Sequence, residues 1–308
     1  MATLTYNDIQ RFDPADWSLG EDGQFHVVGL SGGKDSTALA LALSEFEPRP
    51  YIHICTPTGD ELPEVERHWD DLGQNWLTGE MTFLEANQTL NDYVEHWQMI
   101  PNRTARWCTR KLKTEVTQAF VARLTERANV VKYVGLRADE PGRAGLRYNA
   151  GEGIVEQRFP LQDWHWDVDD VWRYLDRKGV RIPKRTDCAR CFFQTIGEWW
   201  ELWANHPERW AAAERQELRT NHTWRTRKFD DDGNEVMERR FGLTFAASHR
   251  DSWPAWLADL RKAFEAGHRP KTTPHPQDYR PATQETLWGD AVDAYEAENE
   301  QHCGECRK

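Results

Sequence analysis

Residues 31–36, Ser-Gly-Gly-Lys-Asp-Ser, have the composition of a phosphate-binding turn. The two glycines can adopt positive φ and let an anion approach the backbone. Hydroxyl groups and the first N–H groups of a following helix can donate to phosphate oxygens, and the lysine adds a mobile positive charge. The spacing is neither G-x-G-x-x-G nor G-x-x-x-x-G-K-S/T, which indicates a different class of nucleotide loop. The residues assigned to the nucleotide here are Ser31, Gly32, Gly33, Lys34, Asp35, Ser36 and Thr37.

Two aspartates are candidates to bind magnesium or to orient the nucleotide: Asp35 in this turn and Asp60 in a later one. ATP chemistry usually needs a hard cation whose oxygen ligands come from both the protein and the phosphates. Asp35 could instead cap the helix that follows, and Asp60 could be an ordinary turn residue. The sequence leaves both interpretations open.

A basic cluster follows in the middle of the chain. Arg110, Lys111 and Lys113 place three cations within four residues, and Arg103 and Arg106 add two more. In a chain with a formal net charge of −12, such a cluster suits a polyphosphate or a phosphate backbone, because guanidinium groups pair with its oxygens. A solvated helix face is the alternative. The residues assigned to catalysis are Lys34, Asp35, Arg110, Lys111 and Lys113.

The six cysteines have the spacing of metal ligands or redox thiols more than of a disulfide framework. Four of them form two C-x-x-C pairs, and another lies beside the basic cluster. Four thiolates suit a 4Fe-4S cluster, with zinc as the alternative, and a reactive dithiol or cysteines without a ligand are also open. Cys55, in an apolar run, is interpreted as a small core residue. The candidate metal ligands are Cys108, Cys188, Cys191, Cys303 and Cys306.

The elements that must position these residues are strands alternating with helices. Apolar runs at residues 25–30, 51–55 and 130–136 predict strands, and each is followed by a polar turn. Helical patterns begin after residue 36 and near residue 63. This alternation predicts an α/β fold with a doubly wound parallel sheet, whose ligand lies beyond the carboxyl ends of the strands. Arg137 directly follows the third strand, a position that suits a phosphate or sulfate ligand.

The rest of the chain has a different character. Residues 163–178 predict an amphipathic helix that ends at Gly179, and residues 196 to about 218 predict a tryptophan-rich helix whose rings form core or, alternatively, a stacking platform for bases. Residues 225–240 suggest a hairpin around 231–234, or else a solvated turn. The predicted organisation is a nucleotide-binding domain over 1–182, a helical, cysteine-containing subdomain over 183–269, and a linker with a C-terminal tail over 270–308.

The turn at residues 31–36 resembles the pyrophosphate loop (PP-loop) of the adenine nucleotide α-hydrolase-like superfamily. Further segments, at residues 58–64, 106–113, 135–140 and 159–172, resemble the phosphoadenosine phosphosulfate reductase family within it. The match at 135–140 assigns Gly135 and Arg137 to the nucleotide. The C-terminal Cys-Gly-Glu-Cys departs from the cysteine motif of the family's reductases, which speaks against thiol-based reduction.

The intact lysine and glycines of the loop, as the resemblance implies, favour cleavage of ATP between its α and β phosphates. The function expected is adenylation of an acceptor for sulfur transfer, with a nucleic acid as one candidate acceptor. A reductase of an adenylyl sulfate that uses a thiol donor is the first alternative. A nucleotide-binding regulatory module without turnover is the second.

The composition of the chain limits which kinds of partner are expected. The acidic balance excludes general attraction to nucleic acid but leaves a local basic groove open. There is no apolar run of about 18 residues and no signal-peptide pattern at the N-terminus, so we expect a cytoplasmic protein without a membrane partner. The expected ligands are ATP or an adenylyl sulfate and Mg²⁺, with a sulfur donor protein or thiol reductant as partner. A homodimer is also open.

Overall fold

Two compact units make up the chain in this computed structural model, which describes residues 1–79, 81–140, 142–143, 154–272 and 274–278. The first unit contains residues 1–89 and 108–187. The second contains residues 90–107 together with the described residues from 188 onward. No sequence pattern separates residues 90–107 from their neighbours. The predicted domain boundaries at residues 182 and 269 stay a prediction.

A six-stranded, fully parallel sheet is the centre of the first unit, in the order β1-β4-β3-β2-β5-β6. Its strands are β1 (Ala2–Thr5), β2 (Phe25–Gly29), β3 (Tyr51–Cys55), β4 (Met81–Glu85), β5 (Val130–Tyr133) and β6 (Val155–Arg158). The three predicted strands are confirmed as β2, β3 and β5, the last shorter than expected. These three are neighbours in the interior of the sheet, and their buried runs explain why the sequence revealed them. The predicted doubly wound α/β fold is confirmed.

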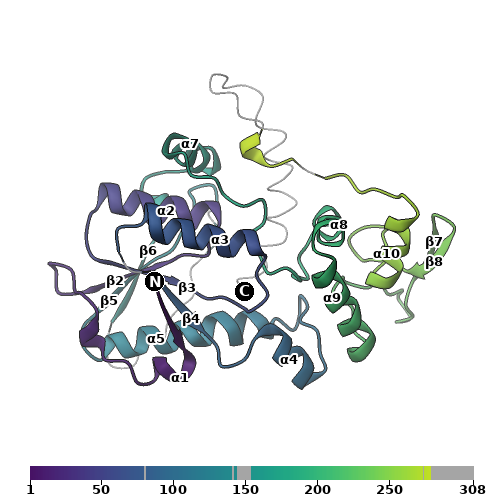
Figure 1. Cartoon of the computed structure of the whole chain (residues 1–308), viewed down its shortest axis with the longest axis horizontal. Helices are drawn as coiled ribbons and strands as arrows, with labels where there is room; N and C mark the ends of the chain where they lie inside the picture. The colour runs from purple at the N-terminus through teal and green to yellow at the C-terminus, as the bar shows by residue number, and fades with distance from the viewer. Residues whose placement is uncertain (80, 141, 144–153, 273, 279–308) are drawn as a thin grey trace. The chain divides into compact units, whose positions relative to one another are not determined.

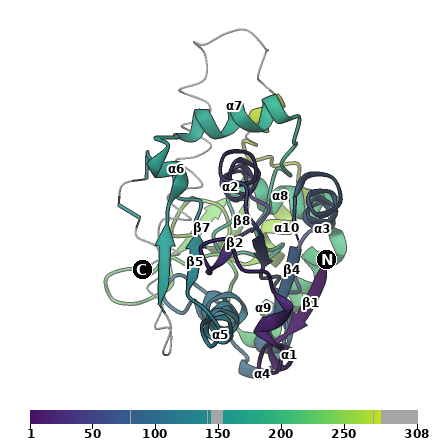
Figure 2. The ribbon, with the colours of Figure 1, turned by 90° about the vertical axis from the view of Figure 1, so that its left-hand side faces the viewer.

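Helices cover both faces of this sheet (Figures 1 and 2). On one face lie α2 (Lys34–Phe46), α3 (Pro63–Asp71) and α7 (Val168–Lys178). On the other lie α1 (Tyr6–Ile9) and α5 (Glu115–Thr125), whose apolar side chains join those of β2 and β3 in one core cluster. Short elements complete the unit: α6 (Pro160–Asp163), a 3₁₀ turn (Pro14–Asp16) and π-helical turns at Leu72–Trp76 and Thr109–Thr114. The predicted end of α7 is confirmed, since Gly179 adopts a left-handed conformation with φ 75°.

The chain order creates a switch point between β2 and β5. From β2 the chain proceeds outward to β3, whereas from β5 it proceeds outward on the other side to β6. The two loops that leave β2 and β5 therefore diverge at the carboxyl edge of the sheet. In doubly wound sheets this is the place where a ligand binds.

The second unit is built of helices and one hairpin: α4 (Leu90–Trp97), α8 (Ile196–Asn205), α9 (Pro207–Thr220), β7 (Met237–Arg240), β8 (Leu243–Ala246) and α10 (Leu257–Glu265), followed by a 3₁₀ turn (Pro276–Asp278). The single helix predicted from 196 to about 218 is wrong. It breaks at His206, which has φ −133° because Pro207 disfavours helical geometry in the residue before it. Trp199 and Trp210 are buried, so the core interpretation of these tryptophans is confirmed.

The hairpin differs from its prediction in position. Strands β7 and β8 pair antiparallel around Phe241 and Gly242, both with positive φ, as a two-residue hairpin turn requires. The turn at 231–234 exists as well. An isolated bridge between Phe229 and Glu235 and the Asp230 N–H, which donates to the Asn234 carbonyl at 2.9 Å, close it. No helix in the described part of the chain is long and apolar enough to cross a membrane.

Candidate nucleotide site

Hydrogen bonds of its own serines hold the loop between β2 and α2 in a turn. The Ser31 N–H donates to Ser36 Oγ at 3.2 Å, and Ser36 Oγ donates to the Gly33 carbonyl at 3.1 Å. Gly33 occupies the N-cap of α2 without a side-chain hydrogen bond. Asp35 therefore does not cap the helix, and the first N–H groups of α2 face the loop, as an anion site requires.

Position 32 requires glycine for two reasons, its backbone conformation and the proximity of a neighbouring side chain. Its φ is 83°, in the left-handed region that glycine adopts without strain. A Cβ at this position would lie 2.6 Å from Trp69 Nε1 of α3. The same Nε1 donates to the Ser31 carbonyl at 3.1 Å, and this hydrogen bond connects α3 to the loop. No local pattern in the sequence marks Trp69 for this role.

A second contact joins the loop helix to the turn after β5. Arg137 Nη1 donates to both carboxylate oxygens of Asp35, at 3.1 and 3.3 Å, although the two residues are 102 positions apart. Gly135 lies against the backbone of α2, where a Cβ would be 3.2 Å from the Asp35 carbonyl oxygen. The divergent loops at the switch point thus meet through Arg137, Asp35 and Gly135.

Arg137 is itself clamped. Asp139 accepts from its Nε at 2.9 Å and from its Nη2 at 3.1 Å, a paired geometry that is among the strongest for arginine. Only 1% of the Arg137 side chain is exposed. Most of its hydrogen-bonding capacity is therefore committed to carboxylates, which makes it a positioning group for Asp35 in this state. In the sequence, Asp139 is recognisable only as part of the match at residues 135–140.

Asp35 is kept ionised by its neighbours. Burial acts to raise the pKa of Asp35, but the positive charges of Lys34 and Arg137 outweigh it and hold the pKa below its ordinary value of 3.8. The Lys34 Nζ lies 3.6 Å from Asp35 Oδ2. An ionised carboxylate at the helix start is the type of oxygen ligand that magnesium takes. The chemistry of Asp35 thus fits magnesium.

The turn after β3 is organised by a glutamate that sequence reasoning missed. Glu61 Oε1 accepts from the Thr58 N–H and hydroxyl, both at 2.7 Å. Its other oxygen accepts from the N–H groups of Gly59 and Asp60, at 3.0 and 3.1 Å. The Asp60 side chain is completely buried. Glu61 was visible in the sequence as part of the matched turn, but the number of donors that converge on it was not.

The basic segment forms the π-helical turn Thr109–Thr114, immediately before α5. Because α5 leads into a parallel strand, this turn lies at the carboxyl edge of the sheet, the edge that carries the loop. Lys111 Nζ pairs with Glu115 at 2.8 Å, and Arg110, 66% exposed, reaches the same carboxylate at 3.8 Å. Lys113 is partly exposed. The catalytic role of these three cations stays a prediction.

The four described cysteines do not group into a metal site. Within the described residues, no three or more His, Cys, Asp and Glu side chains group closely enough to hold a metal ion. Cys108, Cys188 and Cys191 are partly exposed, and Cys303 and Cys306 lie outside the described residues. The iron–sulfur cluster, and zinc as its alternative, therefore stay predictions. Cys55 is buried, and its thiol donates to the Leu30 carbonyl, as a core residue would.

Comparison with known proteins gives one family match. Residues 26–201, more than half of the chain, match the model of the phosphoadenosine phosphosulfate reductase domain. A search of curated proteins found no match. A crystal structure of phosphoadenylyl-sulfate (PAPS) reductase from Candida auris, in a phosphate complex, is 14% identical with a TM-score of 0.39, over 58% of this chain and 82% of that chain.

Proposed function

Because this chain belongs to the phosphoadenosine phosphosulfate reductase family, we propose that it binds an adenine nucleotide at residues 31–37 and acts as an ATP pyrophosphatase. The single observation that carries the proposal is the loop at the switch point. Its glycine backbone adjoins the N-terminus of α2, the Ser36 hydroxyl holds the turn through hydrogen bonds, and a buried arginine bonds to the adjacent carboxylate. Such a site suits the β and γ phosphates of ATP.

The chemistry proposed is adenylyl transfer. An acceptor oxygen bonds to the α phosphorus while the bond from that phosphorus to the bridging α–β oxygen breaks, so pyrophosphate leaves with both bonding electrons. The acceptor proton goes to solvent. The loop holds the departing pyrophosphate, and Lys34 neutralises its charge. Asp35 would hold magnesium, whereas Asp60, which is buried, is a magnesium ligand by sequence prediction alone. When bound, magnesium would shield the charge of the phosphates. A sulfur nucleophile could then displace AMP from the activated acceptor, which is the sulfur transfer that we propose.

The family name supports a second candidate, reduction of an adenylyl sulfate. Two thiols would be oxidised to a disulfide, and the sulfate group would leave as sulfite together with the adenosine phosphate. This reaction needs a thiol donor, such as a small dithiol protein, and no ATP. The two candidates therefore differ in substrate and in products.

The test is product analysis with the full-length protein. With Mg-ATP and candidate acceptors, nucleic acids among them, we expect AMP and pyrophosphate. Lys34→Ala should lower the rate by roughly 100-fold, as loss of one charge-stabilising group does. Lys178→Ala, which removes a lysine that pairs with Glu45 on α2, is the matched control. Sulfite from an adenylyl sulfate without ATP turnover would instead establish the reductase. Tight ATP binding without products would indicate a regulatory module.

A further inference from the structure

A cavity of about 340 Å³ opens beside the phosphate loop, at the carboxyl ends of β1, β3 and β4. Its volume is at the lower end of the range for small-molecule sites, roughly 300–1,000 Å³. We propose that this cavity binds a small organic cation with an ammonium or guanidinium group. This inference goes beyond the proposed function, because it assigns a second ligand, of opposite charge to the nucleotide.

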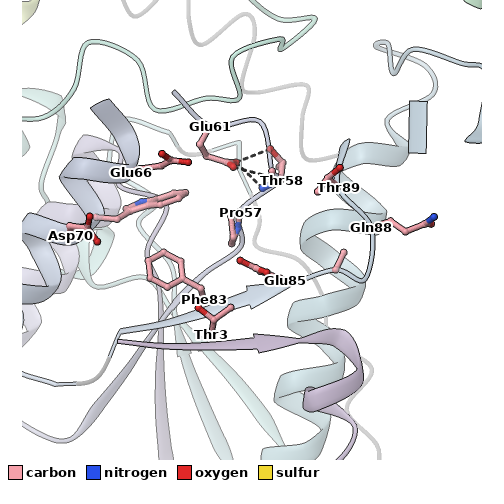
Figure 3. A pocket seen from close by; sticks show the side chains of 13 residues that line it. Thr3, Pro57, Thr58, Glu61, Glu66, Asp70, Phe83, Glu85, Gln88 and Thr89 are labelled. Carbon is pink, nitrogen blue, oxygen red and sulfur yellow. Dashed lines mark hydrogen bonds between the residues drawn. The ribbon is translucent and has the colours of Figure 1, made fainter. Parts of the chain in front are cut away.

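The charge of the cavity is the first argument. Its lining includes Glu61, Glu66, Asp70 and Glu85 and no lysine, arginine or histidine. Figure 3 shows Glu66 and Asp70 coming from α3 and Glu85 from the end of β4. Glu61 is satisfied by the turn at residues 58–60, whereas the other three carboxylates make no hydrogen bond or ion pair within the described part of the chain. Like charges are thus gathered around a cavity whose described lining contains no cationic side chain.

The walls of the cavity are the second argument. The rings of Trp69 and Phe83 lie with centroids 5.6 Å apart and planes tilted by 60°, and both line it. Electron-rich ring faces attract cations, and tryptophan does so most strongly. The hydrogen bond from Trp69 Nε1 to the Ser31 carbonyl fixes this ring in place. Ring faces together with carboxylates are the chemistry that recognises ammonium and guanidinium groups.

The spacing of the carboxylates argues against a metal ion that protein side chains hold alone. Such an ion would need at least three of them around one point, and no group of three or more acidic, histidine or cysteine side chains in the described residues is close enough for that. An organic cation several atoms long can reach carboxylates on α3 and β4 at the same time. The cavity therefore matches an extended cation better than a metal ion.

The test uses agmatine as the probe, because it has a guanidinium at one end and an ammonium at the other. Binding to the full-length protein is measured by calorimetry without nucleotide, so a failure of the proposed function does not affect the result. The variant Glu66→Gln/Asp70→Asn/Glu85→Gln keeps the shape and removes three charges. We expect its Kd for agmatine to rise at least roughly tenfold, and that of Phe83→Leu to rise less. High salt should weaken binding to the unmodified protein.

Glu156→Gln is the matched control, since Glu156 is an exposed carboxylate on β6, the opposite edge strand of the same sheet. It should bind agmatine as the unmodified protein does. Urea unfolding confirms that the triple variant is folded, which we expect because all three side chains are at the surface or partly exposed. Three results would each overturn the proposal: no binding of agmatine, equal binding by the triple variant, or equal affinity for a neutral butylurea of similar shape.

Discussion

At the scale of single residues, Arg137 decides how the candidate site is held. Its guanidinium joins Asp139, two residues away, to Asp35 at the start of α2. Such a bridge needs a planar group with several donors in fixed directions, which lysine lacks. Because the Arg137 side chain is buried, a shorter set of donors in its place could not be completed by water, although Asp35 and Asp139 are themselves partly exposed.

We expect Arg137→Lys to lower the rate of pyrophosphate release by roughly 10- to 100-fold and to destabilise the fold by about 2 kcal/mol. Lysine keeps the positive charge at this position. A lower rate would therefore show that the reaction depends on the fixed geometry of Asp35 more than on the charge beside it. Steady-state kinetics and urea unfolding measure the two effects. Arg173→Lys, at a 66% exposed arginine of α7 that pairs with Asp170, is the control and should change neither. Full activity in Arg137→Lys would reject the positioning role.

At the scale of elements, the loop depends on the contact between its second glycine and α3. Two separate effects require glycine at residue 32: the positive φ and the proximity of the Trp69 ring. Gly23, in the turn before β2, has nearly the same φ of 74° but nothing within 4 Å of a Cβ. The pair therefore separates backbone strain from steric contact.

Gly23→Ala should cost about 1 kcal/mol, the strain of a left-handed alanine. Gly32→Ala should cost at least about 1 kcal/mol more, because Trp69 must move and its hydrogen bond to Ser31 is weakened. Urea unfolding measures both free energies. Gly32→Ala should also weaken ATP binding by roughly tenfold, whereas Gly23→Ala should leave it unchanged. If the two variants are equally stable, α3 does not restrain the loop.

At the scale of the whole molecule, the two compact units should respond to pH in opposite directions. In the first unit, burial lowers the pKa of His53 from its ordinary value of 6.5 to about 4. Neither ring nitrogen has a hydrogen-bond partner among the described residues. In the second, burial raises the pKa of Glu217 from 4.5 to about 8, against the opposing effect of N–H groups from Leu257 and Trp224. Each shift makes the stability of one unit depend on pH.

The signs follow from which state binds the proton. Between pH 6.5 and about 4, unfolded His53 is protonated and folded His53 is not, so the first unit loses stability as the pH falls. Between pH 4.5 and about 8, folded Glu217 is protonated and unfolded Glu217 is not, so the second unit loses stability as the pH rises. We expect changes on the order of 3 kcal/mol for the His53 range and about 5 kcal/mol for the Glu217 range.

Hydrogen exchange with peptide resolution, corrected for intrinsic rates, measures both units in one sample. His53→Phe should remove the acid-side loss in β3 and leave α10 unchanged, and Glu217→Gln should do the reverse. Each variant thus controls for the other. The same pH response in both units would contradict the assignment.

How much could be predicted from the sequence depended on distance along the chain. The loop at 31–36 and the strands β2, β3 and β5 were predictable, because apolar runs, glycines and hydroxyl residues act within a few positions of one another. The break at Pro207 could also have been found locally. Strands β1, β4 and β6 were missed. β1 and β6 lie at the edges of the sheet, where short, mixed sequences suffice, and the interior strand β4 also mixes apolar and polar residues.

By itself, the sequence determined that this protein has a parallel α/β sheet with a phosphate-type loop at the end of a central strand. Only the tertiary structure decided which partners complete that loop: Arg137 bonds to Asp35 and Trp69 bonds to Ser31, whereas Glu61 organises the separate turn after β3. Strand order brings the first two pairs together, and strand order is a property of crossovers between distant segments, which no local spacing encodes. The same reason explains why the acid-lined cavity, formed where three strands end, was not visible in the sequence.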